Sequence, residues 1–475
     1  MSRIPRQTQV PQERVLLCGV RFADEAPFDG EDLSEAAGLV QAAEGLVVGD
    51  GILQRLQRPS PATLFGSGKV LEIGLEIERV HPDAVVVDNE LSPAQGRNLE
   101  KAWKVRIIDR SELILDIFAR RARTRQARLQ VELAQNEYLA PRLRRMWTHL
   151  ERNEGAIGAR GPGETQLETD KRLIRRRIQD LRIELRSIEE RKQREVRTRA
   201  EQFTVGLVGY TNAGKSTVLN RLTGSDELAA DMLFATLDTR TRQWRLSDGR
   251  TVLLSDTVGF VQRLPHHLVA SFHATLEEAL HADLLLHVVD AAHPRAIEQM
   301  EAVEGVLRTV LRGPREEVVV LNKADHVRDP VALAGLQQSA GASAILVSAL
   351  TGAGMDDLDA RVRERLDAHS RLIDVFMPAS AGRLDAQIRA ICTPIERAYD
   401  EDRDEVRVRV RLTDAQIGFL ARTAGPDARF VPVDGDTLAG GDDSDGAPEA
   451  DGAVRIPPRP RRDGSGPDQV SAAGT

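Results

Sequence analysis

The sequence predicts an α/β protein built from several consecutive parts. Short apolar runs such as RVLLCGV and DAVVVD alternate with helix-like stretches over residues 1–119, and the same alternation returns over residues 201–370. Residues 120–200 instead carry apolar residues at the spacing of a coiled-coil seam. The expected architecture is an N-terminal α/β domain, an antiparallel two-helix hairpin, a second α/β domain with a mostly parallel sheet, a small C-terminal α+β domain and a disordered tail.

Composition excludes several classes of protein. The 475 residues include 65 Lys and Arg against 73 Asp and Glu, a net charge of −8, so the chain is no uniformly basic nucleic-acid coat. Cys18 and Cys392 lie too far apart in sequence for a metal-binding cluster or a disulfide framework. No apolar run approaches the length of about 18 residues that a membrane span needs, and the N-terminus lacks the apolar core of a signal peptide. These observations predict a cytosolic protein.

The charge is distributed unevenly. Residues 120–200 contain 22 Lys and Arg against 12 Asp and Glu, so this segment carries +10 and the rest of the chain −18. Such a contrast indicates a local contact with a polyanion, and it is equally compatible with Arg-rich helices that are simply solvated.

Residues 1–119 predict a small α/β domain with a mainly parallel sheet. Within them, Gly66-Ser67-Gly68-Lys69 resembles a phosphate-binding loop. A true loop needs glycine where Thr63 stands and Ser or Thr where Val70 stands. The stretch is therefore interpreted as a turn that caps a helix.

Residues 120–200 predict two helices. A Gly-rich stretch over residues 155–163, GAIGARGPG, interrupts the helical pattern, so the two helices would pair as an antiparallel hairpin with this stretch at its tip. The apolar seam would comprise Leu139, Leu143, Met146 and Leu150 in the first helix and Leu167, Ile174, Ile178, Leu181, Leu185 and Ile188 in the second.

The C-terminal part is expected to be smaller. Over residues 371–435, LDAQIRAICTPIERAY has the pattern of an amphipathic helix and EVRVRVRL alternates as a half-buried strand does. Residues 436–475 are polar and rich in Gly, Pro and Asp, so we expect a disordered acidic tail.

The third segment carries a phosphate loop. TVGLVGYTNAGKSTVLN reads as a buried strand, a Gly-x-x-x-x-Gly-Lys-Ser loop and the start of a helix. Gly209 and Gly214 allow backbone N–H groups to close around phosphate oxygens, Lys215 would contact the β- and γ-phosphates, and Ser216 would bind magnesium.

Downstream residues indicate that the base is guanine. VVVLNKADHV is an apolar strand that ends in Asn322-Lys323-Ala324-Asp325. The Asp325 carboxylate can accept hydrogen bonds from the ring N–H and the exocyclic amine of guanine, a donor pattern that adenine lacks. Ser348-Ala349-Leu350 follows the strand AILV and would place backbone against the guanine oxygen.

Two intervening segments would sense the γ-phosphate. Asp256 ends the strand in LLSDTVGF and could hold magnesium through water, and the backbone N–H of Gly259 could reach the γ-phosphate. In FATLDTRTR, Thr236 could complete magnesium coordination while GTP is bound. Residues 231–242 and 257–270 are thus the predicted switches. Lys215, Thr236 and Gly259 are the predicted catalytic residues.

Two positions bear on hydrolysis. Many small GTPases carry a glutamine after Asp-x-x-Gly, whereas this chain has Phe260, which cannot polarise water. Intrinsic hydrolysis should therefore be slow, with help from a partner or another group. Asn212 resembles an asparagine that holds potassium in some cation-activated GTPases, so K⁺ is a further candidate cofactor beside GTP and Mg²⁺. The predicted nucleotide-binding set is Gly209, Tyr210, Thr211, Asn212, Ala213, Gly214, Lys215, Ser216, Thr217, Phe234, Ala235, Thr236, Leu237, Asp238, Asp256, Thr257, Val258, Gly259, Phe260, Asn322, Lys323, Ala324, Asp325, Ser348, Ala349 and Leu350.

Together these motifs resemble the HflX GTPases of the translation-factor-related class. GARGPGETQLETD and LSPAQGRNLE…RSELILDIFARRA precede the GTPase motifs, and the resemblance covers most of residues 10–370. It departs at Thr239-Arg240, where Pro-Thr is usual, and in the acidic tail. The family implies a GTPase (G) domain at residues 201–370, binding to the large (50S) ribosomal subunit and splitting of 70S ribosomes in the GTP state.

The resemblance also gives the basic hairpin a role. Its arginines would contact rRNA phosphates, and its tip, near the peptidyl-transferase centre, would contact rRNA through Arg160, Gly161 and Gly163. A monomer in the cytoplasm is expected, peripheral at the membrane only through ribosomes. Two alternatives stay open. One is a GTP-dependent assembly or regulatory module that never splits subunits. The other is an ATP-driven RNA remodeller that uses the N-terminal domain, against which the failed phosphate-loop match at Thr63 argues.

Overall fold

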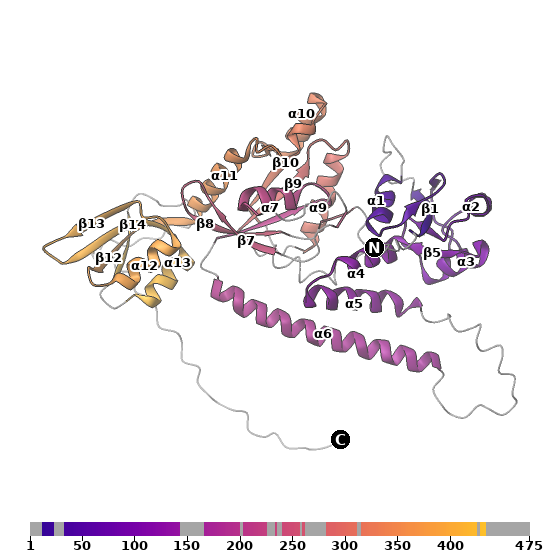
Figure 1. Ribbon diagram of the computed structural model, residues 1–475, viewed down its shortest axis with the longest axis horizontal. Coiled ribbons are helices and arrows are strands. Elements are labelled where there is room, and N and C mark those ends of the chain that lie inside the picture. Colours follow the sequence, from indigo (N-terminus) through magenta and orange to yellow (C-terminus); the bar gives the residue numbers. More distant parts are fainter. Residues whose placement is uncertain are drawn as a thin grey trace, which may run out of the picture. The chain divides into compact units, whose positions relative to one another are not determined.

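The structure is a computed structural model that describes residues 12–22, 33–142, 166–199, 203–225, 233–234, 240–256, 259–261, 282–310, 315–424 and 428–433 (Figure 1). The chain divides into two compact units, residues 1–366 and 367–475. The fold is α/β, as the sequence predicts. The expected tail, the hairpin tip and most of both predicted switches lie outside the described residues.

The N-terminal sheet is parallel throughout its described strands. β1 (Arg14–Phe22) pairs with β2 (Leu46–Val47), β3 (Ile52–Leu56) and β4 (Ala84–Val87), and β4 pairs with β5 (Arg106–Asp109). All four residues of β4 are buried, because apolar clusters cover both faces of the sheet. The connecting helices are α1 (Ser34–Ala42), α2 (Ser67–Val80), α3 (Pro93–Trp103) and α4 (Arg110–Arg121).

The glycine-rich stretch in this domain starts a helix, as predicted. Gly66 is the N-cap residue of α2, and the Lys69 ammonium pairs with Glu72 one turn further on. The geometry is that of an ordinary helix start rather than of a phosphate loop.

The middle segment forms the expected pair of helices, α5 (Arg125–Leu139) and α6 (Gln166–Arg199). Arg125 of α5 pairs with Glu184 of α6, and Glu132, further along α5, pairs with Arg177, which lies earlier in α6. The two helices therefore run antiparallel (Figure 1). Their seam consists of Leu129, Leu133, Leu181 and Leu185. The sequence places Leu139 in this seam, but Leu139 is 44% exposed, because the contact uses Leu129 and Leu133 in the preceding turns of α5.

The second sheet has the order β11-β10-β9-β6-β8-β7. Its strands are β6 (Thr204–Gly209), β7 (Arg240–Arg245), β8 (Thr251–Asp256), β9 (Leu284–Asp290), β10 (Glu317–Asn322) and β11 (Ile345–Leu346). All pairings are parallel except that of the edge strand β7 with β8. Its helices are α7 (Lys215–Thr223), α9 (Ala296–Val310), α10 (Pro330–Ala340) and α11 (Met355–Ala368), with a 3₁₀ turn at Ala324–His326.

The two α/β parts of the first unit share an apolar core. Ile114, Ile117 and Phe118 of α4 belong to the same buried cluster as Phe234 and Phe260. This cluster therefore joins the N-terminal sheet to both segments predicted as switches.

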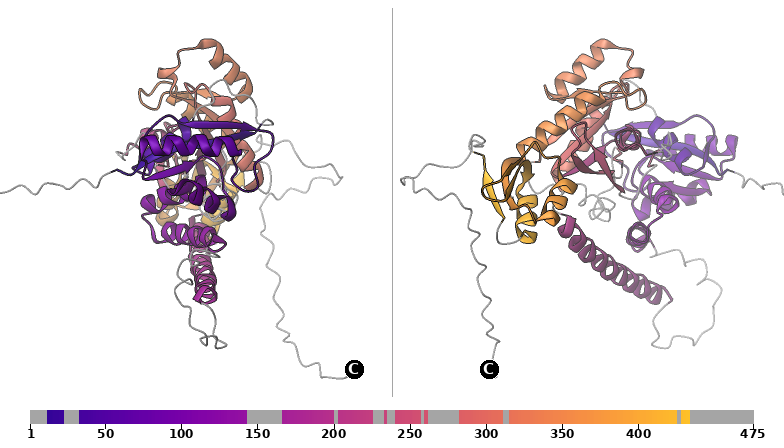
Figure 2. Two further views of the ribbon diagram at one scale, coloured as in Figure 1. Left: turned by 90° about the vertical axis from the view of Figure 1, so that its right-hand side faces the viewer. Right: turned by 60° about the vertical axis from the view of Figure 1, so that its left-hand side comes forward.

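The C-terminal unit has the order β13-β14-β12-β15 in an antiparallel sheet. Its elements are β12 (Ser370–Pro378), α12 (Gly382–Ile391), β13 (Glu396–Asp400), β14 (Glu405–Thr413), α13 (Asp414–Thr423) and β15 (Arg429–Pro432). Both helices cover one face of the sheet (Figures 1 and 2). β14 alternates buried valines with partly exposed arginines, as predicted. The expectation of one helix through IERAY is wrong, because α12 ends at Ile391 and these residues form β13.

Among the residues that the structure describes, no helix is both long enough and apolar enough to cross a membrane.

Candidate functional site

The site is built around the loop between β6 and α7, where two glycines make close contacts. Gly209 has a φ of +151°, and a Cβ there would lie 2.2 Å from the carbonyl oxygen of Val288 on β9. Gly214 has a φ of +93°, and a Cβ there would lie 2.3 Å from Nδ2 of Asn322. Side chains are excluded at both positions, so the loop packs directly on β9 and on the end of β10.

Lys215 is the first residue of α7 and is buried. Its ammonium donates hydrogen bonds to the carbonyl oxygens of Gly209, at 3.0 Å, and Tyr210, at 2.8 Å. Burial lowers the pKa of Lys215 to about 8, although the nearby Asp256 carboxylate acts in the opposite direction. The loop backbone thus holds the Lys215 ammonium in place. A positive charge beside a helix N-terminus is suited to binding a polyanion such as a triphosphate.

Two side chains with oxygen donors lie in contact with each other beside this lysine. The Ser216 hydroxyl donates to Oδ2 of Asp256 at 3.0 Å, and Asp256 is buried at the end of β8. A hydroxyl and a carboxylate are oxygen donors of the kind that Mg²⁺ prefers. These two residues therefore fit a magnesium ion, which would supply positive charge beside the phosphate loop. The third predicted ligand, Thr236, lies outside the described residues.

The beginning of the second predicted switch lies against the phosphate loop. A Cβ on Gly259 would approach Cγ2 of Thr211 to 2.6 Å and Nζ of Lys215 to 3.1 Å. The Thr211 N–H donates to the Phe260 carbonyl oxygen at 2.7 Å, and the Phe260 N–H donates to that of Gly209 at 3.2 Å. The Phe260 side chain is buried in the core shared with the N-terminal domain. This position therefore supplies packing and no group that could orient water.

The predicted base-recognition residues come together at the ends of β10 and β11. Asn322 donates through Nδ2 to the Ala213 carbonyl oxygen at 2.9 Å and accepts from the Ala349 N–H at 3.0 Å, so it ties the phosphate loop to the Ser348–Leu350 segment. The Ser348 hydroxyl donates to Asp325 at 2.6 Å, and this hydrogen bond lowers the pKa of the Asp325 carboxyl. Asp325 is thus held ionised, as recognition of two guanine donors requires.

Sequence reasoning missed two residues of this site. Asp290 at the end of β9 accepts from the Lys323 ammonium at 2.6 Å and so positions the Asn-Lys-x-Asp segment. Its place at a strand end next to β10 was a signal available in the sequence. Glu35 of α1 accepts a hydrogen bond from the Tyr210 hydroxyl, and it comes from a part of the chain with no recognisable motif.

Other predicted residues are described by their backbone conformation or exposure, and some lie outside the described part of the chain. Asn212 has a φ of +64°, in the loop beside Thr211. Leu350 is 70% exposed. The predicted residues outside the described part of the chain are Ala235, Thr236, Leu237, Asp238, Thr257, Val258, Arg160, Gly161 and Gly163.

Comparison with known proteins agrees with this arrangement. Three family models match consecutive segments: "GTP-binding GTPase N-terminal" at residues 30–119, "GTP-binding GTPase Middle Region" at 121–199 and "50S ribosome-binding GTPase" at 204–323. GTPase HflX of Escherichia coli (strain K12) is 43% identical over 402 residues, covering 84% of this chain and 93% of the relative. GTPase HflX of Magnetococcus marinus is 45% identical over 396 residues, covering 82% and 91%.

Among solved structures, a GTP-binding protein from the archaeon Sulfolobus solfataricus in complex with GDP is 23% identical. The match covers 74% of this chain and 98% of the archaeal chain, with a TM-score of 0.39.

Proposed function

Because this chain belongs to the HflX family of GTPases, we propose that it binds the large ribosomal subunit and dissociates 70S ribosomes in its GTP-bound state. GTP hydrolysis is the activity of the family, and in this proposal it resets the factor. The observation that carries the proposal is the match of residues 204–323 to a 50S ribosome-binding GTPase, directly following the basic helical pair. The place of action is the cytoplasm, and the acting form is a monomer.

The helical pair supports contact with rRNA. Arg175 and Arg176 of α6 are exposed and lie outside its apolar seam, so these two cations can contact phosphates without breaking the packing of Leu181 and Leu185. In the proposal, the tip residues Arg160, Gly161 and Gly163 contact rRNA beyond the ends of these helices.

The nucleotide roles follow from the site geometry. Lys215 contacts the β- and γ-phosphates, Asp325 selects guanine, and the Gly259 N–H binds the γ-phosphate. Magnesium would be held by Ser216 and, through water, by Asp256, with Thr236 joining in the GTP state, and it would supply positive charge against the phosphates.

The remaining members of the nucleotide set fall into three segments. The residues around the phosphates are Gly209 to Gly214 and Thr217. Those in the two switches are Phe234, Ala235, Leu237, Asp238, Thr257, Val258 and Phe260. Those beside the base are Asn322, Lys323, Ala324, Ser348, Ala349 and Leu350.

Hydrolysis needs help that Phe260 cannot give. During hydrolysis, water attacks the γ-phosphorus while its bond to the bridging oxygen breaks, and a group must orient that water. Phe260 is apolar and buried, so we propose that the large ribosomal subunit stimulates hydrolysis. Asn212 lies in the phosphate loop at the position that would hold a stimulating K⁺.

A sucrose-gradient profile of purified 70S ribosomes tests the proposal. With this protein and a non-hydrolysable GTP analogue, we expect the 70S peak to be replaced by subunit peaks, and we expect no change with GDP. Asp325→Asn, which should not bind GTP, is the matched control and should leave the 70S peak intact. An Arg160→Ala variant should keep nucleotide affinity and split ribosomes less efficiently.

The same gradient separates the alternatives. An intact 70S peak that carries the protein would contradict splitting and favour an assembly or regulatory module. Absence of the protein from every ribosomal peak would overturn the ribosomal proposal. ATP hydrolysis that survives Lys215→Ala would favour an ATP-driven remodeller. The pairing of Lys69 with Glu72 argues against this alternative, because it places Lys69 at an ordinary helix start rather than in a phosphate loop.

A further inference from the structure

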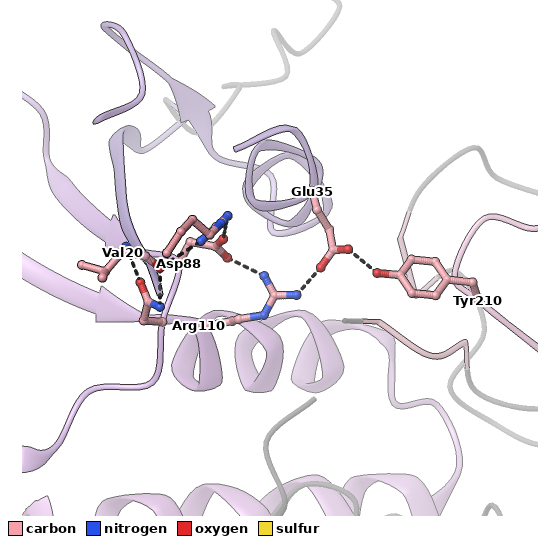
Figure 3. Close-up of polar contacts among 7 residues, drawn as sticks. Val20, Glu35, Asp88, Arg110 and Tyr210 are labelled. Atoms are coloured by element: carbon pink, nitrogen blue, oxygen red, sulfur yellow. Dashed lines mark hydrogen bonds and ion pairs between the residues drawn. The ribbon is translucent and has the colours of Figure 1, made fainter. Parts of the chain in front are cut away.

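A row of alternating charges crosses the N-terminal domain and ends on the phosphate loop (Figure 3). Arg21 of β1 pairs with Asp88 at 2.7 Å, and Asp88 also pairs with Arg110. Arg110 pairs in turn with Glu35, and the other oxygen of Glu35 accepts a hydrogen bond from the Tyr210 hydroxyl. Four charges that sum to zero thus connect the N-terminal sheet to the second residue of the Gly-x-x-x-x-Gly-Lys-Ser loop.

The middle of the row is buried. Arg110, the first residue of α4, is only 3% exposed, and Asp88 is 4% exposed. Burial acts to lower the pKa of Arg110, but Asp88 and Glu35 together raise it, so the guanidinium stays charged and bound to both carboxylates. A carboxylate held in this way has a fixed orientation, and Glu35 presents its second oxygen to Tyr210 in one direction (Figure 3).

The backbone of Tyr210 also makes contacts within the site. Its carbonyl oxygen accepts from the Lys215 ammonium at 2.8 Å. It also forms a parallel bridge with Phe260, the residue after Gly259. The orientation of this one residue thus bears on both the lysine and the glycine assigned to the γ-phosphate.

A cavity of about 350 Å³ lies beside the contact, lined by Glu35 and Gly38 of α1 and by Thr211 and Asn212 of the loop. The Tyr210 ring is itself buried in the apolar cluster that contains residues of α1 and α4, so the hydrogen bond to Glu35 adds a directional contact to that packing.

We propose that Glu35 and Tyr210 are positioning residues for GTP hydrolysis. In this role the N-terminal domain, through Glu35, fixes the first peptide of the phosphate loop and thereby the placement of Lys215 and Gly259 around the γ-phosphate. GDP has no γ-phosphate for Gly259 to bind, and it keeps the Lys215 contact to its β-phosphate, so the Glu35–Tyr210 contact should matter more for hydrolysis than for GDP binding. The inference concerns the chemical step and does not depend on ribosome splitting.

The test is Tyr210→Phe, which removes the hydroxyl and keeps the ring. In an assay without ribosomes, we expect kcat for GTP hydrolysis to fall about tenfold, since small displacements of reacting groups are costly. The Kd for GDP should stay within about twofold, because phosphate-loop contacts to the β-phosphate are retained.

Tyr138→Phe is the matched control. Tyr138 is also a buried tyrosine whose hydroxyl donates to a glutamate, Glu112, but both residues belong to the helices after the N-terminal sheet. Its removal should leave kcat unchanged. A merely structural role for Tyr210 would instead lower the melting temperature and the GDP affinity together, with no selective loss of kcat.

A double-mutant cycle makes the inference specific to the pair. Glu35→Ala should lower kcat to a similar extent, and the double variant should be no worse than either single variant. An unchanged or increased kcat in Tyr210→Phe, or additive losses in the double variant, would overturn the proposal. Because no ribosomes are present, this outcome is distinguishable from a failure of subunit splitting.

Discussion

The ring of Phe118 on α4 meets the ring of Phe234 edge to face, with centroids 4.7 Å apart and an interplanar angle of 83°. Both side chains are fully buried, and Phe234 has a φ of +56°, a conformation that is rare for a bulky residue. Phe234 begins the FATLD sequence in which the first switch is predicted. The aromatic contact therefore anchors the entry to that segment on the N-terminal domain.

Phe118→Ala should lower the free energy of unfolding by about 3–5 kcal/mol, because it leaves a cavity in the shared core and removes the edge-to-face contact. Urea denaturation followed by circular dichroism measures the change. Phe118→Leu, which fills more of the space, should lose less. Equal stability of the alanine variant and the unmodified protein would show that the two domains do not share this core in solution.

Asp325→Asn should abolish measurable GTP binding, since an amide cannot accept hydrogen bonds from both guanine donors. Titration with a fluorescent GTP analogue measures the loss. Xanthine carries a carbonyl where guanine has its amine, so the variant should bind xanthosine triphosphate better than the unmodified protein does. Unchanged GTP affinity would show that Asp325 does not contact the base.

The pH dependence of GTP use should reflect Lys215. Burial lowers the pKa of this lysine to about 8 in the free protein, so the ammonium is present below pH 8 and is lost as the pH rises through that value. Because kcat/KM reports ionisations of the free enzyme, it should be flat near pH 7 and decline above about pH 8. A steady-state pH profile measures this, and a kcat/KM that holds constant to pH 9.5 would contradict the assignment.

Gly259→Ala should impair GTP hydrolysis strongly, with a loss in kcat/KM of about a hundredfold or more, because the new methyl group meets Thr211 and the Lys215 ammonium. Gly305→Ala is the matched control, since a Cβ there has no neighbour within 4 Å. Gly305 lies inside α9, so its replacement should raise stability by up to about 1 kcal/mol and leave activity intact. Equal activities of the two variants would argue against the proposed place of Gly259.

Local patterns in the sequence predict much of this molecule. The continuous apolar run of β4 predicts a strand buried on both faces, and the Val-Arg alternation of β14 predicts a strand buried on one. The contacts that bring Asn322 to Ala213 and Ser348 to Asp325 follow from the motifs that contain these residues.

The rest depends on contacts between distant parts of the chain. Glu35 and Tyr210 are 175 residues apart, and no sequence motif predicts that they lie in contact. The sequence shows only that Phe260 stands where many GTPases have glutamine. The burial of its side chain depends on packing in the same cluster as residues of α4 and α5, which the sequence does not show. The sequence predicts helix where β13 forms, because a short segment such as IERAY fits both the helical and the strand period, and only its pairing with β14 decides between them.

The core shared by the two α/β parts also constrains how the protein is made. Synthesis runs from the N-terminus, so Ile114, Ile117 and Phe118 emerge well before Phe234 and Phe260 exist to cover them. The nascent N-terminal domain therefore exposes an apolar surface until the second α/β part has been synthesised. Partly folded chains that expose such a surface tend to aggregate. A fragment ending at residue 119 would keep that surface permanently, so the two parts are best expressed and studied as one chain.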